Sequence, residues 1–261
     1  MNGYDLLHVH GPAINMNFIS IDERLGRCLF TRMTRFNTFD NQKVLTLHGL
    51  FSPYSKYSIT KEYEERLINQ FDNIICVDKV IYSYVENYLN RSRHTKNIWH
   101  IPNSIDTIKF QETPFPNKDK LQIGYIGRLE EPHGIKLLLE VIKNLPPWAE
   151  MHIVVAGSDA AVMQFKVKVS EISPIESKLN IHIRSNLKYD EVPYFYKMID
   201  VLFNPVLFEA ITRVSLEAMA SGRPVIMTNI GDRDPIKDGR TGYLIDNSLK
   251  DALDALTYIF E

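Results

Sequence analysis

Short apolar runs alternate with helix-length segments along almost the whole chain. In the first part, the runs at residues 6–9, 44–47, 74–77 and 98–101 are rich in Val, Ile and Leu. They show little polar alternation, which is typical of parallel strands covered on both faces. Amphipathic segments at 22–35, 60–71 and 79–90 predict the intervening helices. This order favours an α/β fold.

The alternation stops after residue 101, where Pro102, Pro114 and Pro116 lie among polar residues. Proline and polar residues interrupt both helical and strand periodicity. We therefore expect a linker at 104–120, between a domain at 1–103 and a second domain at 121–261.

A second alternation fills the rest of the chain. The predicted strands are 121–126, 151–156, 180–183, 201–204, 224–227 and 243–245. The predicted helices are 135–145, 160–173, 189–197, 213–220 and 249–260. Six strands joined by right-handed crossovers form a complete doubly wound parallel sheet of the Rossmann type.

Composition narrows the class of protein. The chain has 261 residues, of which 44% are hydrophobic, and a net charge of −2, so disorder and nucleic-acid binding are not expected. Two cysteines predict no disulfide framework, and no apolar run is long enough to cross a bilayer, which fits a cytoplasmic protein. Four arginines within one predicted helix leave contact with the inner membrane surface open, although a solvated helix face is the preferred interpretation: Arg24, Arg27, Arg32 and Arg35.

The helix expected at 213–220 offers a site for a phosphate. Thr212 is a suitable N-cap, and it leaves amides of Arg213, Val214 and Ser215 at the positive end of the helix dipole. Glu217 lies one turn further along the helix, and Glu209 precedes it in the loop. Carboxylates beside an anion site suit the recognition of sugar hydroxyls. An ordinary capped helix with surface acids is the alternative.

Two further features could contribute chemistry. Gly127 and Arg128 form a turn at the carboxyl end of a strand, where an arginine can hold a diphosphate. His8 and His10 share one face of a strand, and His48 follows the next strand. The histidines could bind a metal, hydrogen-bond a substrate hydroxyl or serve a structural role.

Together these segments resemble the GT-B glycosyltransferases of the family 4 type. In the second half, GYIGRLEEPHGIKLLLEVI resembles the family's first strand and following helix, and FEAITRVSLEAMASGRPVI resembles its E-x7-E signature. GDRDPIKDGRTGYLI matches the stretch downstream. In the first half, DLLHVHG, KVLTLHG, DNIICVD and HIPNSIDTIKF match in place and order.

The resemblance implies two Rossmann-like domains and a retaining transfer of sugar from a UDP- or GDP-linked donor, without a metal ion. It places the transferred sugar at Glu209, the donor diphosphate at Gly127, Arg128 and His133, and the ribose at Glu217. The helix start at Thr212, Arg213 and Val214 would offer amides to the phosphate. His10 would face the reacting sugar from the first domain.

The sequence departs from this family in three respects. His133 stands where a lysine is usual, and imidazole is mostly neutral at pH 7. Ala210 and Thr212 replace glycines after Glu209. Relative to that family, we expect the first domain to be without its opening strands, which would leave the strand at 6–9 with an uncovered edge.

These departures keep two alternatives open beside an active transferase. One is a catalytically silent or partial subunit, completed by a partner chain or a homodimer. The other, less favoured, is a metal hydrolase using His8, His10 and His48. The acceptor, whether a sugar, a lipid or a protein, is not specified by the sequence.

Overall fold

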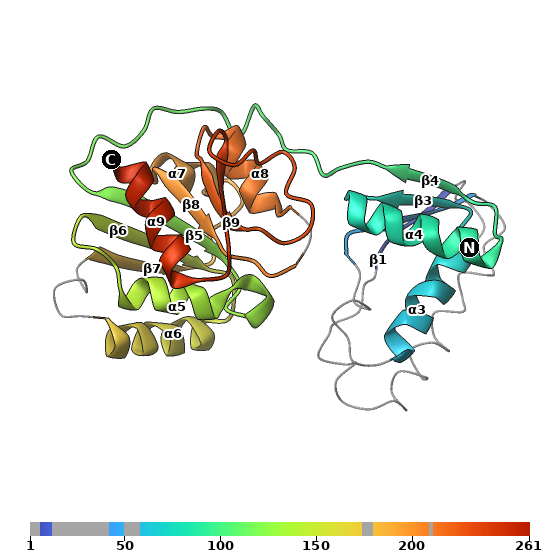
Figure 1. Cartoon of the computed structure of the whole chain (residues 1–261), viewed down its shortest axis with the longest axis horizontal. Helices are drawn as coiled ribbons and strands as arrows, with labels where there is room; N and C mark the ends of the chain where they lie inside the picture. The colour runs from blue at the N-terminus through green and yellow to red at the C-terminus, as the bar shows by residue number, and fades with distance from the viewer. Residues whose placement is uncertain (1–5, 12–41, 50–57, 174–179, 209–210) are drawn as a thin grey trace. The chain divides into compact units, whose positions relative to one another are not determined.

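The computed structural model describes residues 6–11, 42–49, 58–173, 180–208 and 211–261, which fall into two compact units, 1–103 and 104–261 (Figure 1). The predicted helix at 22–35 with its four arginines, Cys28 and the proposed catalytic Glu209 lie outside the described residues.

The first unit contains a four-stranded parallel sheet in the order β1-β2-β3-β4. Its strands are β1 (Leu6–Gly11), β2 (Gln42–Leu47), β3 (Asn73–Cys76) and β4 (Asn97–His100). Helices α3 (Ser58–Asn69) and α4 (Lys79–Ser92) supply the rest of its core, including the fully buried Ile68 and Val85. Among the described strands β1 lies at an edge, and its Leu6 is half exposed.

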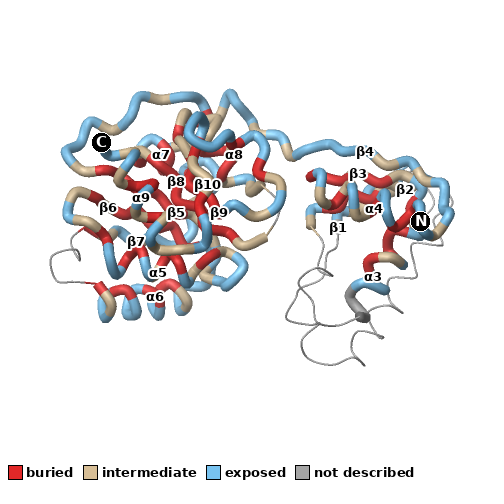
Figure 2. Tube along the Cα trace, in the orientation of Figure 1, coloured by how far each residue is buried: buried red, intermediate tan, exposed pale blue. Residues whose placement is uncertain are grey.

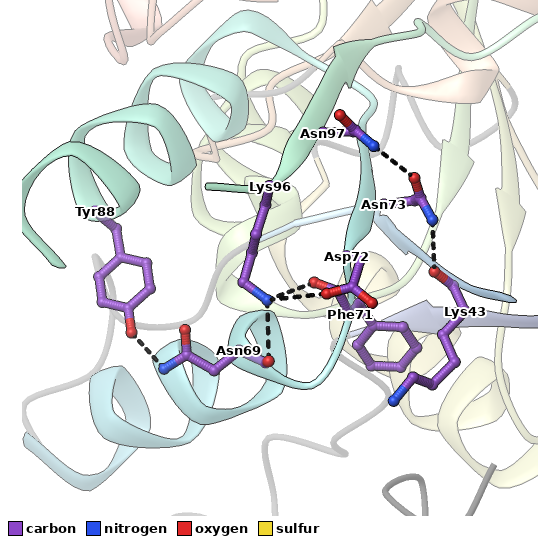
Figure 3. A network of polar contacts seen from close by, with 8 residues as sticks. All are labelled: Lys43, Asn69, Phe71, Asp72, Asn73, Tyr88, Lys96 and Asn97. Atoms are coloured by element: carbon purple, nitrogen blue, oxygen red, sulfur yellow. Dashed lines mark hydrogen bonds and ion pairs between the residues drawn. The ribbon is translucent and has the colours of Figure 1, made fainter. Parts of the chain in front are cut away.

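A polar network fastens the amino ends of these strands to α3 (Figure 3). The Lys96 ammonium donates to the carbonyls of Asn69 and Phe71, at 3.0 and 2.7 Å, just where α3 ends. A cation at a helix C-terminus satisfies carbonyls that have no partner within the helix. The Asn69 amide also donates to the Tyr88 hydroxyl at 2.6 Å, which ties α3 to α4.

The second unit contains six parallel strands in the order β10-β9-β8-β5-β6-β7. The strands are β5 (Leu121–Gly127), β6 (Ala149–Val155), β7 (Ile181–Ser185), β8 (Val201–Asn204), β9 (Val225–Thr228) and β10 (Gly242–Ile245). Numbered within this unit, the order is 6-5-4-1-2-3, which is the Rossmann order. The chain direction across the sheet reverses between β5 and β8.

Helices cover both faces of this sheet, and the buried residues follow the strands (Figure 2). The helices are α5 (Ile135–Lys143), α6 (Asp159–Ile172), α7 (Val192–Lys197), α8 (Arg213–Ala220) and α9 (Leu249–Phe260). α5, α6 and α9 pack on the face that carries Ile123, Ile153 and Phe203. α7 and α8 pack on the opposite face with Leu202 and Met227. The predicted α/β class with Rossmann-like parallel sheets is confirmed.

The segment 104–120, predicted as a linker, belongs to the second unit. Phe110 is 1% exposed and lies edge-on to the rings of Tyr189 and Tyr196. The buried guanidinium of Arg223 donates to the Thr113 hydroxyl and the Pro114 carbonyl, at 2.6 and 2.8 Å. The buried ring of Phe110 and the hydrogen bonds from the Arg223 guanidinium therefore anchor this segment, although its sequence has no helical or strand periodicity.

The structure also bears on membrane-spanning helices and on the state of a cysteine. Among the described residues, no helix is both long and apolar enough to cross a bilayer. Cys76 is a free thiol buried in the core of the first unit. Burial raises the pKa of this thiol to about 12, so Cys76 acts as a small apolar core residue.

Candidate functional site

The loops after β5 and β8 meet at the carboxyl edge of the second sheet, where the strand order reverses. The Leu207 amide donates to the Pro132 carbonyl at 2.8 Å. Gly134 has φ +73°, and a Cβ atom there would lie 1.8 Å from the Pro205 carbonyl oxygen. Only glycine allows the two backbones to approach this closely. In open α/β sheets, ligands bind at the point where the strand order reverses.

β5 ends at Gly127 on this edge, and Arg128 follows it in the loop. The hydroxyl of the buried Tyr125 donates to the Arg128 carbonyl at 2.7 Å, and the Ala156 amide donates to the Gly127 carbonyl at 2.8 Å. The Arg128 residue itself is exposed. A rigid turn thus presents a guanidinium to solvent, which is the arrangement that anion binding needs.

His133 lies in a 3₁₀ turn, Glu131–His133, which starts three residues after Arg128. Its half-buried ring packs edge-on against Phe208, with 5.5 Å between centroids. Burial lowers the pKa of His133, and Arg128 lowers it further, against the opposing effect of Glu130. The imidazole is therefore neutral near pH 7 and adds no permanent charge to the site.

Helix α8 starts on the same edge, and Thr212 caps it as predicted. The Thr212 hydroxyl oxygen accepts from the Ser215 amide at 3.1 Å, so this amide is not available to a ligand. The buried Asn204 side chain, at the end of β8, donates to the hydroxyls of Thr212 and Ser215. The amides of Arg213 and Val214 have no partner among the described residues, which leaves two donors at the positive helix end.

Glu217 lies one helical turn behind these amides and is 6% exposed. One carboxylate oxygen accepts from the Tyr196 hydroxyl at 3.1 Å, and the other lies 3.8 Å from the Arg213 guanidinium. Burial raises the pKa of Glu217, although the Tyr196 hydrogen bond and the charges of Arg213 and Lys109 act in the opposite direction. The Glu217 carboxylate is therefore oriented by Tyr196 at one oxygen, and its other oxygen faces the exposed guanidinium of Arg213.

Two residues that shape this site have no recognisable signal in the sequence. Tyr196, on α7, orients Glu217 through its hydroxyl, and the two residues are 21 positions apart in the sequence, so no local motif contains both. Arg233 is 3% exposed and donates to the Thr228 carbonyl at 2.8 Å, which fixes the end of β9 beside the loop after β8. A buried arginine has no local signature, because only the fold brings its partners to it.

The predicted histidines form a cluster in the first unit. His10 Nδ1 lies 2.8 Å from His48 Nε2, and the rings of His8 and His10 are 4.4 Å apart. His8 Nε2 lies 2.7 Å from the Thr46 hydroxyl. The expectation that His8 and His10 share a face is confirmed, and they lie at the carboxyl end of β1 beside β2.

The structure brings together seven of the predicted site residues at one edge of the second unit: Gly127, Arg128, His133, Thr212, Arg213, Val214 and Glu217. His10 belongs to the first unit, and Glu209 lies outside the described residues. The α8 amides and the Arg128 guanidinium are groups that can bind an anion, and the Glu217 carboxylate can accept from hydroxyls. This edge of the α/β unit therefore carries the chemical groups that a phosphorylated, hydroxyl-bearing ligand requires.

Comparison with known proteins gives the family. The model for "Glycosyl transferases group 1" matches residues 120–261, and the chain belongs to this family. The putative glycosyltransferase YtcC of Bacillus subtilis (strain 168) is 25% identical over 259 residues, which covers 94% of this chain. The chain spans 61% of the length of that relative.

Solved structures share the fold at low sequence identity. Sucrose-phosphate synthase from Thermosynechococcus elongatus has a TM-score of 0.74 at 18% identity, over 98% of this chain and 64% of that one. Anabaena HepE in complex with UDP and glucose has a TM-score of 0.72 at 16% identity, over 99% of this chain and 68% of that one. These similarities confirm the expected GT-B fold class.

Proposed function

We propose that this chain transfers a sugar from a nucleoside diphosphate sugar to an acceptor, with retention of configuration. The observation that carries the proposal is the start of α8, where two amides that have no partner among the described residues lie one turn from the buried carboxylate of Glu217. Membership in the group 1 glycosyltransferases supports it. The HepE structure also supports it, because that protein has the same fold and was solved in complex with UDP and glucose.

The second unit would hold the donor. The Arg213 and Val214 amides and the Arg128 guanidinium would bind the diphosphate, and Glu217 would accept hydrogen bonds from the ribose hydroxyls. In the reaction, the bond from the sugar's anomeric carbon to the diphosphate oxygen breaks, and its electron pair leaves with the diphosphate. The acceptor oxygen bonds to that carbon, and its proton passes to the departing phosphate.

The charge that develops on the leaving group determines where stabilisation is needed. Fixed amides and a guanidinium stabilise an oxyanion without reorganising, which lowers the barrier. We assign this role to Arg128 and the α8 amides, with no metal ion at the diphosphate. Glu209 is assigned to the transferred sugar and His10 to its reacting face.

Calorimetric titration of the whole chain with UDP and GDP tests the donor site. We expect one nucleotide to bind, and Arg128→Ala to weaken it about tenfold or more, because a hydrogen bond to a charged group contributes about 1.5–3 kcal/mol. Arg240→Ala is the matched control, since Arg240 is exposed and precedes β10, away from the carboxyl edge. Absence of binding by either nucleotide to the folded protein would contradict the proposal.

Turnover distinguishes an active transferase from a silent or partial subunit that needs a partner chain. Donor hydrolysis or transfer is followed by NMR, which also reports the anomeric configuration of the product. Glu209→Gln should abolish turnover while nucleotide binding persists, and Glu171→Gln on α6 is the control. Nucleotide binding without turnover, restored by an added partner chain, would favour the subunit.

A further inference from the structure

Three potential metal ligands gather on the second sheet, away from the candidate donor site. They are Glu150 and His152 on β6 and His182 on β7, and one ligand atom from each lies within 4.8 Å of the other two. Their approach follows from register, because His152 pairs with His182 across the strands, and Glu150 shares the face of His152. Gly127 pairs with Val155, three residues further along β6, or about 10 Å away.

The hydrogen bonds around His152 fix which ring nitrogen carries the proton. The Gln122 side-chain amide donates to the Lys120 carbonyl at 2.8 Å, so its oxygen must face the other way. That oxygen lies 2.8 Å from His152 Nε2, which is therefore the protonated nitrogen. The Nδ1 atom keeps its lone pair. A histidine that donates its second N–H to an oxygen acceptor is the usual arrangement of a metal-binding imidazole.

The surroundings leave room for an ion. A cavity of about 210 Å³ is bounded by His152 and His182 together with residues of α7, including Tyr194 and Phe195. The side chain of His182 is 45% exposed and that of Glu150 is 22% exposed, so both can turn. Donors around a tetrahedral Zn²⁺ lie roughly 3.4 Å apart, so these side chains need to close by about 1 Å or slightly more. The rings of His152 and His182 are stacked, with centroids 4.9 Å apart and an interplanar angle of 21°, so the exposed His182 ring must also rotate to direct its lone pair at a shared ion.

The donor set also selects the kind of ion. Two imidazoles and one carboxylate suit Zn²⁺ and similar transition metals, whereas Mg²⁺ and Ca²⁺ prefer oxygen ligands. The negative charge of Glu150 acts on His152, but the positive charges of Lys118 and Arg184 oppose it, so no net negative charge attracts a cation. Binding must then come from directional bonds to nitrogen, which again favours Zn²⁺.

We infer that Glu150, His152 and His182 form a zinc-class metal site that joins the edge strand β7 to β6. A fourth position faces the cavity and is open to water or another ligand. The site is independent of the proposed transfer reaction, and its effect would be to stabilise the second unit.

Zinc titration by calorimetry tests the site, on full-length protein purified without a histidine tag. We expect one Zn²⁺ to bind at this site, no binding of Mg²⁺, and a rise in melting temperature with Zn²⁺. His182→Ala and Glu150→Gln should each weaken Zn²⁺ binding at least tenfold and abolish that rise. Both replaced side chains are partly exposed, so the variants should fold.

Two control variants separate this site from other histidines. His94→Ala removes an exposed histidine of the first unit and should leave Zn²⁺ binding unchanged. His48→Ala should remove only binding that belongs to the histidine cluster of that unit. Zinc binding that persists in His182→Ala, or is lost only in His48→Ala, would overturn the inference.

Discussion

At the scale of single residues, the candidate site buries an ionisable carboxyl group, and burial of its charged form disfavours folding. Glu217 is nearly buried, and burial raises the pKa of its carboxyl above the ordinary 4.5. The folded protein therefore binds the Glu217 proton more tightly than the unfolded chain does. Its contribution to stability is fully present below pH 4.5 and is lost as the pH rises through the folded pKa.

Glu217→Gln should separate stability from binding. At pH 7 to 8 the variant should melt at the same or a higher temperature than the wild type, because no carboxylate charge is buried. It should bind nucleotide about tenfold or more weakly, since glutamine has one acceptor oxygen in place of two and lacks the negative charge that strengthens a hydrogen bond from a ribose hydroxyl. Thermal denaturation and calorimetry measure both. Glu140→Gln on the exposed face of α5 is the control, and a loss of stability in Glu217→Gln at pH 8 would refute the argument.

His133 predicts a pH dependence of nucleotide binding. Burial lowers its pKa below the ordinary 6.5, so the imidazole is mostly protonated only at a pH below 6.5. Binding of a nucleoside diphosphate should tighten as the pH falls through that range, because the imidazolium then faces the diphosphate. His133→Lys should bind severalfold more tightly at pH 8 and lose this part of the dependence.

His133→Ala serves as the reference for that titration. Protonation of the nucleotide itself affects every variant equally, so the difference between wild type and His133→Ala isolates the imidazole. If the affinities of these two proteins changed in parallel from pH 5.5 to 8, the assignment of His133 to the phosphate site would be wrong.

At the scale of elements, the donor edge depends on contact between two loops rather than on either loop alone. Gly134 allows the loop after β5 to touch the backbone of Pro205 after β8. Gly134→Ala should destabilise the second unit by at least ~2 kcal/mol, from positive φ and from overlap with the Pro205 carbonyl. It should also weaken nucleotide binding, because Arg128 and α8 lie on the displaced elements.

Gly239→Ala separates the two causes. Gly239 has φ +68° but no atom within 4 Å of an added Cβ, so it carries the backbone strain without the overlap. Chemical denaturation should show a smaller loss, of about 1 kcal/mol, and calorimetry should show unchanged nucleotide affinity. Equal losses in both variants would mean that loop contact has no energetic role.

At the scale of the whole molecule, the described residues form two units with separate hydrophobic cores. One core lies on β2, β3, α3 and α4, and the other two cores lie on both faces of the six-stranded sheet. Phe110 and Arg223 attach the connecting segment to the second unit.

A fragment comprising residues 104–261 should therefore fold alone and bind nucleotide with nearly the affinity of the whole chain. Circular dichroism and calorimetry measure these properties, and saturating nucleotide should raise the melting temperature. A fragment starting at residue 118 is the matched comparison, since it lacks Phe110, Thr113 and Pro114 and should be less stable. Equal stability of the two fragments would contradict the anchoring role of the segment.

Much of the second unit was predictable because its signals are local. The helices at 213–220 and 249–260 and the strand at 201–204 have the predicted bounds, since caps and apolar runs define them within a few residues. The packing of the segment 104–120 was not predictable, because Phe110 is buried by rings that lie some eighty residues later. Tyr196 was missed for the same reason.

The sequence by itself determined the α/β class, the order of the elements, the cap of α8 and the family. These depend on periodicity, turn chemistry and motifs, which act between neighbouring residues. Only the tertiary structure decided that Glu217 is buried against Tyr196, that Gly134 must be glycine, and that Glu150, His152 and His182 meet. Each of these depends on strand register or on contact between distant loops, and a linear sequence does not contain the distances across a sheet.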